Sequence, residues 1–327
     1  MDNNAKLRPL YLGKILYERT DEDHCLTTNE LIQILKDEYS ISSHRQTIPT
    51  EIELLKDFGM DIECVRARQN KYHLVSREFD LAELKLIIDA VDACKFISGR
   101  ESKALSAKLA SLAGNGHAEE LKRNGCAEGR VRTTNEKTCL IIDAVNTAIN
   151  MKRKISFHYF TYDENKKKTL RHDGEPYVFS PYELIWDGDR YYILGWSDLH
   201  GEMRTFRVDR IVEPPVVLKA KAVKKPAGFS GAGFVGINYR MFAGEVKKIN
   251  LICDNDTMDS MIDRFGEKVQ TEPVDAEHFR LTADVADSHV FYAWVFGFGE
   301  KVKICGPEDM KDAYCKMLKD ALRFIKQ

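Results

Sequence analysis

The sequence predicts an α+β protein built from several domains. Its 327 residues exceed what one ordinary hydrophobic core accommodates. Apolar residues recur at helical spacing through much of the first 150 positions, whereas residues 180–211 are alternating aromatic and β-branched runs separated by Asp-Gly turns. From position 246 onward, strand-like and helix-like segments alternate. These three patterns predict a helical N-terminal part, a small antiparallel β-sheet and a C-terminal α/β domain.

Residues 1–76 predict a winged helix-turn-helix DNA-binding domain. Helical patterns cover residues 6–19, 28–38 and 43–58, and strand patterns cover residues 60–65 and 71–75. Thr27 and Glu30 form a capping box before the second helix. Pro49 inside the third helical segment either kinks that helix or indicates a later start near Thr47. The last two segments predict a hairpin with a basic tip, as a wing requires.

Phosphate contacts favour basic side chains on a projecting loop, and base contacts favour polar side chains early on the third helix. The expected DNA-binding residues are therefore Ser43, His44, Arg45, Gln46, Thr47, Thr50, Arg66, Arg68 and Lys71. The alternative is a small helical domain whose basic hairpin tip is only solvated.

Residues 77–152 predict a helical connector. Helical patterns cover 79–97, 103–113 and 135–152, and the glycines within 114–130 predict a loop or a partial helix. These segments carry no recognisable chemistry, so their apolar faces are expected to pack on one another or on a second copy of the chain. We therefore expect a homodimer.

Residues 153–222 predict short strands that close on themselves into a barrel, beginning with a strand at 155–161. Four arginines, Arg190, Arg204, Arg207 and Arg210, are interleaved with aromatic residues in this region. Guanidinium groups beside aromatic rings suit phosphate pairing combined with base stacking.

Two runs in this region resemble the WYL domain. They are Arg190-Tyr191-Tyr192-Ile193-Leu194-Gly195 and Arg204-Thr205-Phe206-Arg207-Val208-Asp209-Arg210-Ile211, with Tyr191-Tyr192-Ile193 at the Trp-Tyr-Leu triplet that names the family. The resemblance implies a small Sm-like or SH3-like barrel that senses a ligand, commonly inside bacterial transcription regulators. Residues 43–52 resemble the helix-turn-helix that often precedes such domains, although Pro49 and Thr50 replace an aromatic and a basic residue.

An anionic effector, such as a nucleotide or a short single-stranded nucleic acid, suits these residues best. The expected effector-binding residues are His158, Tyr159, Tyr182, Arg190, Tyr191, Tyr192, Arg204, Arg207 and Arg210. In a regular strand, Arg204 and Arg210 would share one face and Arg207 would lie on the other. The alternative is structural, with the arginines paired to Asp189, Glu202 or Asp209. Trp186, Trp196 and Phe206 are expected in the core.

Residues 223–244 predict a flexible glycine-rich linker. Its literal GxGxxG, from Gly231 to Gly236, lacks both the preceding strand and the helix signal of a dinucleotide site, so we reject that function. Residues 245–327 predict a ferredoxin-like βαββαβ domain with a closing helix. Residues 294–299 with Gly306-Pro307-Glu308 resemble the WCX extension that follows WYL domains.

The composition and the motif content limit the classes of function that the chain can have. The net charge is −2, so DNA contacts must come from a local basic patch. No HExxH, GxSxG or Cys-His signature is present, so we expect no enzyme, cofactor or metal. The sequence has no long apolar run and no signal-peptide core, which predicts a cytoplasmic protein without membrane contact. Its eight cysteines form no CxxC pair, which predicts reduced, mostly buried thiols.

These observations together predict a DNA-binding transcriptional regulator that senses an anionic effector. The alternative is a protein that binds RNA or single-stranded nucleic acid without a transcriptional role.

Overall fold

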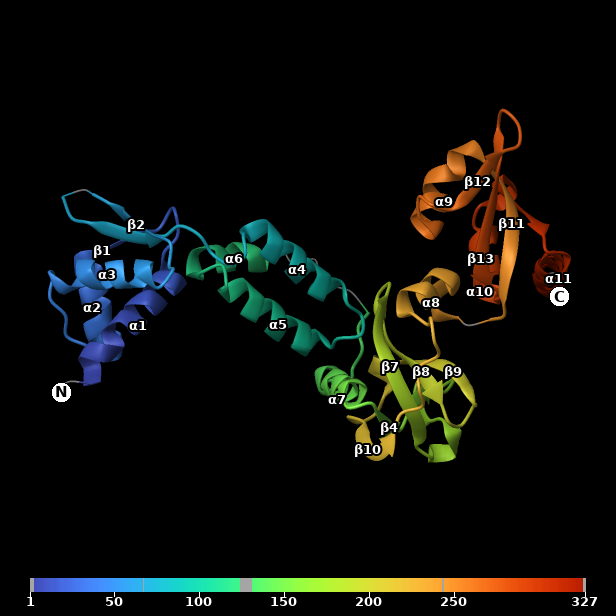
Figure 1. The fold of residues 1–327 in the computed structure, drawn as a ribbon, viewed down its shortest axis with the longest axis horizontal. Helices are drawn as coiled ribbons and strands as arrows, with labels where there is room; N and C mark the ends of the chain where they lie inside the picture. The colour runs from blue at the N-terminus through green and yellow to red at the C-terminus, as the bar shows by residue number, and fades with distance from the viewer. Residues whose placement is uncertain (1–2, 67, 124–130, 243, 326–327) are drawn as a thin grey trace. The chain divides into compact units, whose positions relative to one another are not determined.

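The computed structural model describes residues 3–66, 68–123, 131–242 and 244–325 of a mixed α+β chain (Figure 1). The chain divides into two compact units, Met1–Glu136 and Lys137–Gln327. Within the described residues, no helix is long and apolar enough to cross a membrane.

The first unit begins with three helices and a three-stranded sheet. The helices are α1 (Asn3–Arg19), α2 (Thr28–Tyr39) and α3 (Thr47–Asp57). The strands β1 (Leu26–Thr27), β2 (Ile62–Val65) and β3 (Lys71–Leu74) form an antiparallel sheet in the order β1-β3-β2. Buried Leu12, Leu31 and Ile48 belong to the core that joins the helices to the sheet. The predicted capping box is confirmed, since Thr27 Oγ1 accepts the Glu30 N–H at 3.2 Å and Glu30 accepts the Thr27 N–H at 2.7 Å.

Helix α3 begins at Thr47, later than residue 43, where the helical pattern started. Ser43, His44, Arg45 and Gln46 therefore lie in the segment that leads into the helix. Pro49 falls in the first turn, where a backbone N–H has no partner inside the helix, so its missing donor costs the helix no bond. Of the two alternatives for Pro49, the later start is confirmed.

Three further helices complete the first unit: α4 (Leu81–Ala93), α5 (Gly99–Ser111) and α6 (Asn115–Arg123). Residues 124–130 of the expected loop, which include Cys126, lie outside the described residues. Buried Leu84, Ile88 and Leu121 belong to a core of their own. The Arg77 guanidinium donates to the carbonyls of Tyr17 at 2.7 Å, Thr20 at 2.8 Å and Leu112 at 3.2 Å, which ties α1 to the end of α5.

The second unit opens with a five-stranded antiparallel sheet in the order β10-β4-β7-β8-β9. Its strands are β4 (Arg153–Phe157), β7 (Tyr177–Asp187), β8 (Arg190–Ser197), β9 (Glu202–Arg207) and β10 (Val216–Lys221). The strand predicted over 155–161 is interrupted, and its second half forms a separate hairpin of β5 (Phe160–Tyr162) with β6 (Lys168–Leu170). In the described residues β9 and β10 are not paired, so hydrogen bonds do not close this sheet into a complete barrel.

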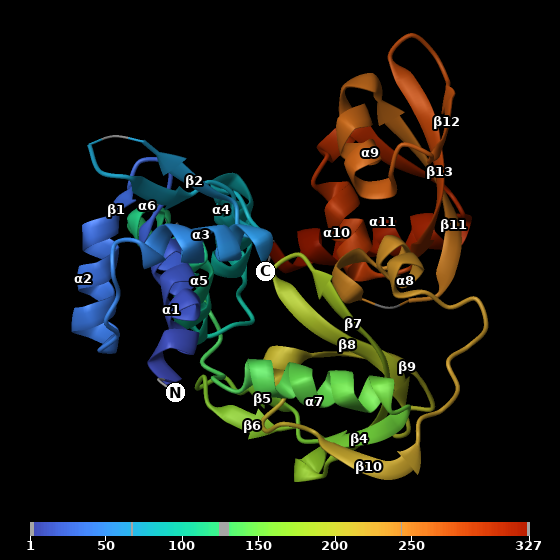
Figure 2. The same cartoon turned by 60° about the vertical axis from the view of Figure 1, so that its left-hand side comes forward.

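Helix α7 (Thr138–Asn150) packs against this sheet (Figure 2). Its buried Ile141 and Val145 share a core with Ile155 and Phe179 of the strands. The expected connector, 77–152, therefore ends before α7, because the apolar stripe of that helix covers the apolar face of the sheet.

The glycine-rich segment is not wholly a linker, because α8 (Gly231–Ile237) forms within it. Ser230 caps this helix by accepting the Gly233 N–H at 3.0 Å. A Cβ on Gly231 would lie 1.9 Å from Oε2 of Glu183 on β7, so the glycine allows the close approach of helix and strand. The chain before α8 is irregular, which fits the rejection of a dinucleotide site.

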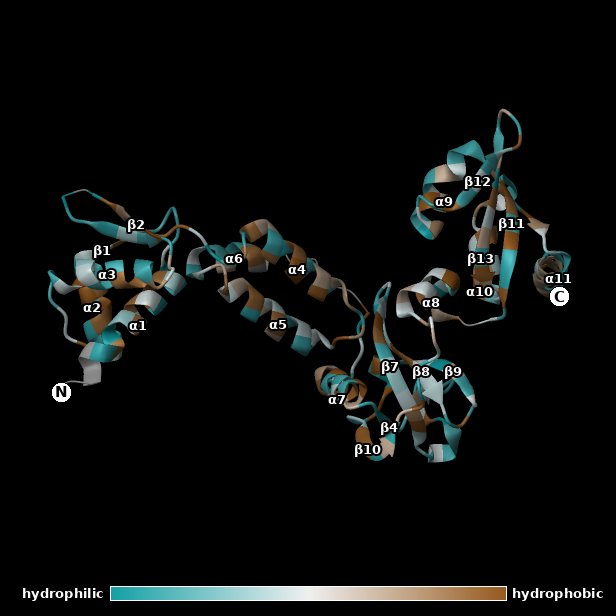
Figure 3. Cartoon of the chain, viewed as in Figure 1, coloured by the Kyte–Doolittle hydropathy of each residue, from teal (hydrophilic) through white to brown (hydrophobic). Residues whose placement is uncertain are grey.

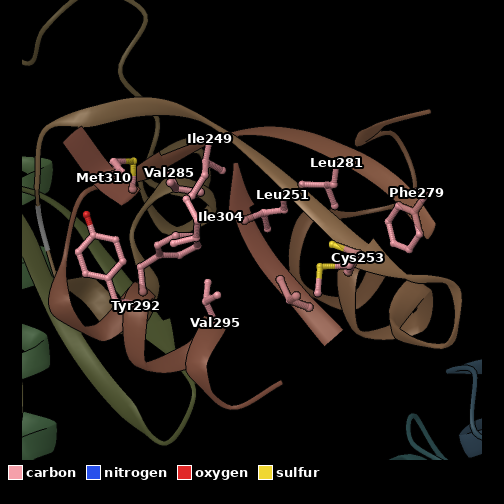
Figure 4. Packing of buried hydrophobic residues seen from close by; sticks show 13 residues of the cluster. Ile249, Leu251, Cys253, Phe279, Leu281, Val285, Tyr292, Val295, Ile304 and Met310 are labelled. Carbon is pink, nitrogen blue, oxygen red and sulfur yellow. The ribbon is translucent and has the colours of Figure 1, made fainter. Parts of the chain in front are cut away.

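The C-terminal domain has the expected βαββαβ order followed by a helix. Its elements are β11 (Val246–Asp254), α9 (Met258–Phe265), β12 (Gln270–Pro273), β13 (His278–Ala286), α10 (His289–Phe296), β14 (Val302–Gly306) and α11 (Glu308–Ile325). The antiparallel sheet has the order β12-β13-β11-β14. Strand β11 carries both hydrophobic and hydrophilic residues (Figure 3), and buried residues alternate with half-buried ones from Ile249 to Asp254. Ile249 and Leu251 of that strand meet Leu281 and Val295 in the core (Figure 4).

The cysteines differ from expectation. Cys94 and Cys253 are buried, whereas Cys139, Cys305 and Cys315 are exposed. The expectation of mostly buried thiols is therefore wrong for the described residues.

Candidate functional site

The carboxylate of Asp209 organises a cluster of arginines at the end of β9. The strand stops at Arg207, and Val208–Arg210 forms a 3-10 turn that returns Asp209 toward the strand. Asp209 accepts Arg207 Nε at 3.0 Å and Nη2 at 2.7 Å, and it also accepts Arg190 Nη1 at 3.2 Å. Its side chain is only 5% exposed. A buried carboxylate thus holds two half-buried guanidinium groups in place.

This turn corrects the expected placement of the arginines, because a regular strand does not continue to Arg210. The structural alternative is confirmed for three of them: Arg207 pairs with Asp209, Arg190 also lies 3.5 Å from Asp189, and Arg204 pairs with Glu202. In the part of the chain that the structure describes, Arg210 makes no hydrogen bond or ion pair. Asp209 occupies two N–H donors of Arg207, and a guanidinium has five. Donors therefore remain for a ligand.

Two tyrosines accompany the cluster. Tyr192 lies opposite Arg207 in the β8–β9 register. The hydroxyl of buried Tyr159 accepts the Arg207 backbone N–H at 3.2 Å, and Arg171 lies 6.0 Å from the Tyr159 ring centroid. Burial raises the pKa of both tyrosines above the ordinary value. Both phenols therefore stay neutral near pH 7 and keep their hydroxyl protons.

Other expected effector residues lie elsewhere. Tyr182 lines a groove of about 530 Å³ together with Lys152, Lys221, Lys224 and Lys225. Tyr191 contacts Trp186, with ring centroids 6.3 Å apart, and packs toward the core under α7. His158 is exposed in the break between β4 and β5. The nine expected residues thus do not form one pocket.

The aromatic residues expected in the core differ in burial. Phe206 is buried and contacts Tyr159, Tyr177 and Phe179, as predicted. Trp186 is 50% exposed and Trp196 is half-buried, so the prediction is wrong for Trp186.

Sequence reasoning missed the charged neighbours at the tip of the β7–β8 hairpin. Asp187 lies opposite Arg190 in the register. Burial raises the pKa of Asp187, and the charges of Arg264 and Arg240 act in the opposite direction. These two arginines are remote in sequence and carry no motif, so no local signal could have found them.

In the first unit, the expected DNA contacts follow the start of α3 and the hairpin of β2 and β3. The exposed members of this set are His44, Arg45, Gln46, Thr50, Arg66, Arg68 and Lys71, and the half-buried members are Ser43 and Thr47. Arg8 Nε donates to Glu51 Oε1 at 2.7 Å, which fixes α3 to α1. A groove of about 600 Å³ between α3 and β2 is lined by Pro49 and Arg66, and also by acidic Glu53 and Glu63.

Two protein-family models match separate segments of this chain. The model of the WYL domain matches residues 141–216, and the model of the WCX domain matches residues 248–322. Proteasome accessory factor B/C (PafBC) of Arthrobacter aurescens is 19% identical with a TM-score of 0.30, and the match covers 99% of this chain and 47% of the PafBC chain. A CRISPR Cas-related protein is 11% identical with a TM-score of 0.27, and the match covers 100% of this chain and 92% of that protein's chain. No curated protein matches the chain.

The first domain match includes most of α7, the strands β4, β7, β8 and β9 of the sheet, and the Asp209 cluster, and the second includes most of the C-terminal α/β domain. The chain is thus a WYL domain-containing protein in which a WCX domain follows the WYL domain.

Proposed function

We propose that this protein is a DNA-binding transcriptional regulator whose WYL domain senses an anionic effector. The observation that carries the proposal is the arrangement around Asp209, which holds Arg190 and Arg207 beside neutral Tyr159 and Tyr192. Fixed guanidinium groups with unused N–H donors pair with phosphate oxygens, and the half-buried ring of Tyr192 offers a surface on which a base stacks, whereas the buried Tyr159 ring supports the cluster from the core. A nucleotide or a short single-stranded nucleic acid supplies both a phosphate group and a base.

Arg210 strengthens the proposed effector site. It adjoins Asp209, and its charge acts on the Tyr159 hydroxyl. Because it has no ion pair among the described residues, it can receive a phosphate without first breaking an internal contact. Arg207 and Arg210 thus take different roles, one held by Asp209 and one available.

The three helices and the hairpin of the first unit would act as a winged helix that reads duplex DNA. Exposed Arg45, Arg66, Arg68 and Lys71 supply the local positive charge that the nearly neutral chain lacks as a whole. Polar Gln46 and Thr50 at the start of α3 suit contacts to base edges.

Regulation requires that the effector bind one arrangement of the protein more tightly than another. In a homodimer, two winged helices would address two half-sites, so the operator would be roughly palindromic. The C-terminal ferredoxin-like domain would complete the effector site or join the dimer contacts. No catalytic role is proposed for the scattered histidines.

A selection from genomic DNA fragments tests the proposal. The full chain should enrich a few duplex sites, and nucleotides or short single strands should change its affinity for them. Enrichment of no duplex site would contradict the proposal.

One observation favours a second candidate, a single-strand-binding protein without a transcriptional role. Tyr182 and four lysines share one groove, which combines a stacking ring with backbone-pairing charges. Under that function, the same selection should enrich single strands regardless of sequence.

A further inference from the structure

Arg264 of the WCX domain is a cation with unsatisfied donors. It lies at the end of α9, and its Nε and Nη2 atoms are buried without a hydrogen-bond partner in the described part of the chain. A buried donor without a partner destabilises the folded state, and the cost is larger when the donor is charged. Buried polar groups in native proteins nearly always have partners, so an orphaned pair on one side chain indicates a missing acceptor.

The surroundings hold this guanidinium in place. Its Cζ atom lies 5.2 Å from the ring centroid of Tyr239 and 5.3 Å from that of Phe265. Ring faces attract the cation but do not accept the in-plane N–H groups, so the two contacts orient Arg264 without satisfying it. Arg240, whose backbone is left-handed at φ 50°, approaches the same Tyr239 ring at 5.7 Å. Two guanidinium groups thus share one aromatic support.

The neighbouring negative charge is that of Asp187, at the tip of the β7–β8 hairpin. Its field acts on Arg264, yet no ion pair joins the two among the described residues. Asp187 lies opposite Arg190, and its charge also acts on Tyr192, which lies opposite Arg207. The charges of Arg264 and Arg240 thus act on the hairpin tip that carries Arg190, a member of the Asp209 cluster.

We propose that Arg264 and Arg240 form the second half of the effector site and bind a phosphate group of the ligand. The inference rests on the proposed function and extends it to the WCX domain. The unpartnered atoms of Arg264 are Nε and Nη2, the same two atoms through which Arg207 donates to Asp209. Two oxygens of a phosphate group accept from these two donors in the same paired geometry. A ligand held from both sides fixes α9 against the β7–β8 hairpin, so the WCX domain takes part in sensing.

The test compares the full-length protein with Arg264→Met and with Arg280→Met, a matched control at an exposed position on β13 of the same domain. Thermal unfolding is followed with about 10 mM inorganic phosphate and in sodium chloride of equal ionic strength, since a ligand of the folded state raises Tm. Phosphate should raise the Tm of wild type and Arg280→Met. In Arg264→Met the apparent affinity for phosphate should fall about tenfold or more.

A second readout separates ligand binding from a structural role. In chloride, Arg264→Met should be at least as stable as wild type, because an apolar side chain replaces an unpaired buried charge. If Arg264→Met does not fold, Arg264→Lys takes its place, since it keeps the charge but lacks the paired edge, and it must show the same loss of phosphate binding. An equal phosphate shift in wild type and the Arg264 variant overturns the inference, as does the absence of a shift in wild type.

Failure of this inference is distinguishable from failure of the proposed function. If Arg207→Gln abolishes the response of duplex binding to the effector while Arg264→Met retains it, the WCX contact is wrong and the regulator stands. If wild type selects no duplex site, the proposed function fails whatever the phosphate measurement gives.

Discussion

Both carboxylate oxygens of Asp209 accept hydrogen bonds from Arg207: Oδ1 accepts from Nε at 3.0 Å and Oδ2 accepts from Nη2 at 2.7 Å. The same Oδ2 accepts Nη1 of Arg190 at 3.2 Å. One nearly buried negative charge thus offsets the repulsion between two neighbouring cations. The arrangement fixes the positions of both guanidinium groups.

Replacement of Asp209 by Asn should therefore destabilise the protein. Two half-buried guanidinium groups would lose their counter-charge, and the free energy of unfolding should fall by about 2 to 3 kcal/mol. Glu202→Gln is the control, because Glu202 and its partner Arg204 are both exposed and such pairs contribute at most about 1 kcal/mol. Urea unfolding measures both variants. Equal losses in the two variants would show that Asp209 does not hold the cluster.

The first unit allows a matched pair of glycine substitutions. Gly59 and Gly114 both have positive φ, 107° and 82°, but a Cβ at Gly59 meets no atom within 4 Å, whereas at Gly114 it would lie 2.5 Å from Arg77 Nη2. Gly59→Ala should cost about 1 kcal/mol through backbone strain alone. Gly114→Ala should cost about 1 to 2 kcal/mol more, because Arg77 must release carbonyls to which it is bound. Chemical denaturation that gave the same loss for both would argue against the Arg77 junction.

The pair of His278 and Asp275 predicts a pH dependence in the WCX domain. The hydrogen bond to Asp275, 2.8 Å from Nδ1, raises the pKa of His278 above 6.5. A raised pKa stabilises the folded state below pH 6.5, and this contribution is lost as pH rises through the folded-state pKa. The backbone hydrogen bond from Glu277 and the side-chain bond from His278 lower the pKa of Asp275 below 3.8, so the stability that this carboxylate contributes is lost as pH falls through its folded-state pKa.

An NMR titration of the imidazole checks this pair. Asp275→Asn should bring the pKa of His278 back toward 6.5. Asp254→Asn is the control, since Asp254 lies 3.5 Å from the other ring nitrogen and acts only through its charge. A larger change in the control than in Asp275→Asn would overturn the assignment.

The wing should contribute to DNA affinity through phosphates. Each phosphate contact adds about one to the slope of log K against log salt, so Arg66→Ala with Arg68→Ala should reduce that slope by about 2 and weaken binding across sequences. Lys316→Ala with Lys319→Ala removes two exposed charges from α11 and should leave the slope unchanged. Fluorescence anisotropy at several salt concentrations measures the slopes. An unchanged slope in the double arginine variant would count against the wing.

The elements that the sequence predicted best are those encoded by neighbouring residues. Thr27 caps its helix as expected because the capping side chain and its N–H donor lie three positions apart, and Asp80 caps α4 with the same spacing. The hairpins around Gly188 and Gly201 follow from turns with positive φ, at 58° and 64°.

The predictions fail where contacts between distant parts of the chain determine the structure. The periodicity of α7 predicted a helix but not that it would cover the sheet of the WYL domain, and β10 carried no clear signal of its own. The pairing of Arg190 and Arg207 with carboxylates was the structural alternative, and the structure shows those pairs. The sequence did not predict the turn that buries Asp209 and ends β9 at Arg207, outside which Arg204 pairs with Glu202. Tyr182 and Arg264 show the same limit, because the residues around each come from separate segments.

The central claim is that an anion on the arginines of the WYL domain changes how the N-terminal unit binds DNA. The most direct test is fluorescence anisotropy of a selected duplex, with and without a hexathymidylate effector, for wild type and Arg207→Gln. We predict a change in duplex affinity of about tenfold in wild type, within the usual range of coupling free energies, and none in the variant. An unchanged affinity in wild type, or an equal change in both proteins, would contradict the claim.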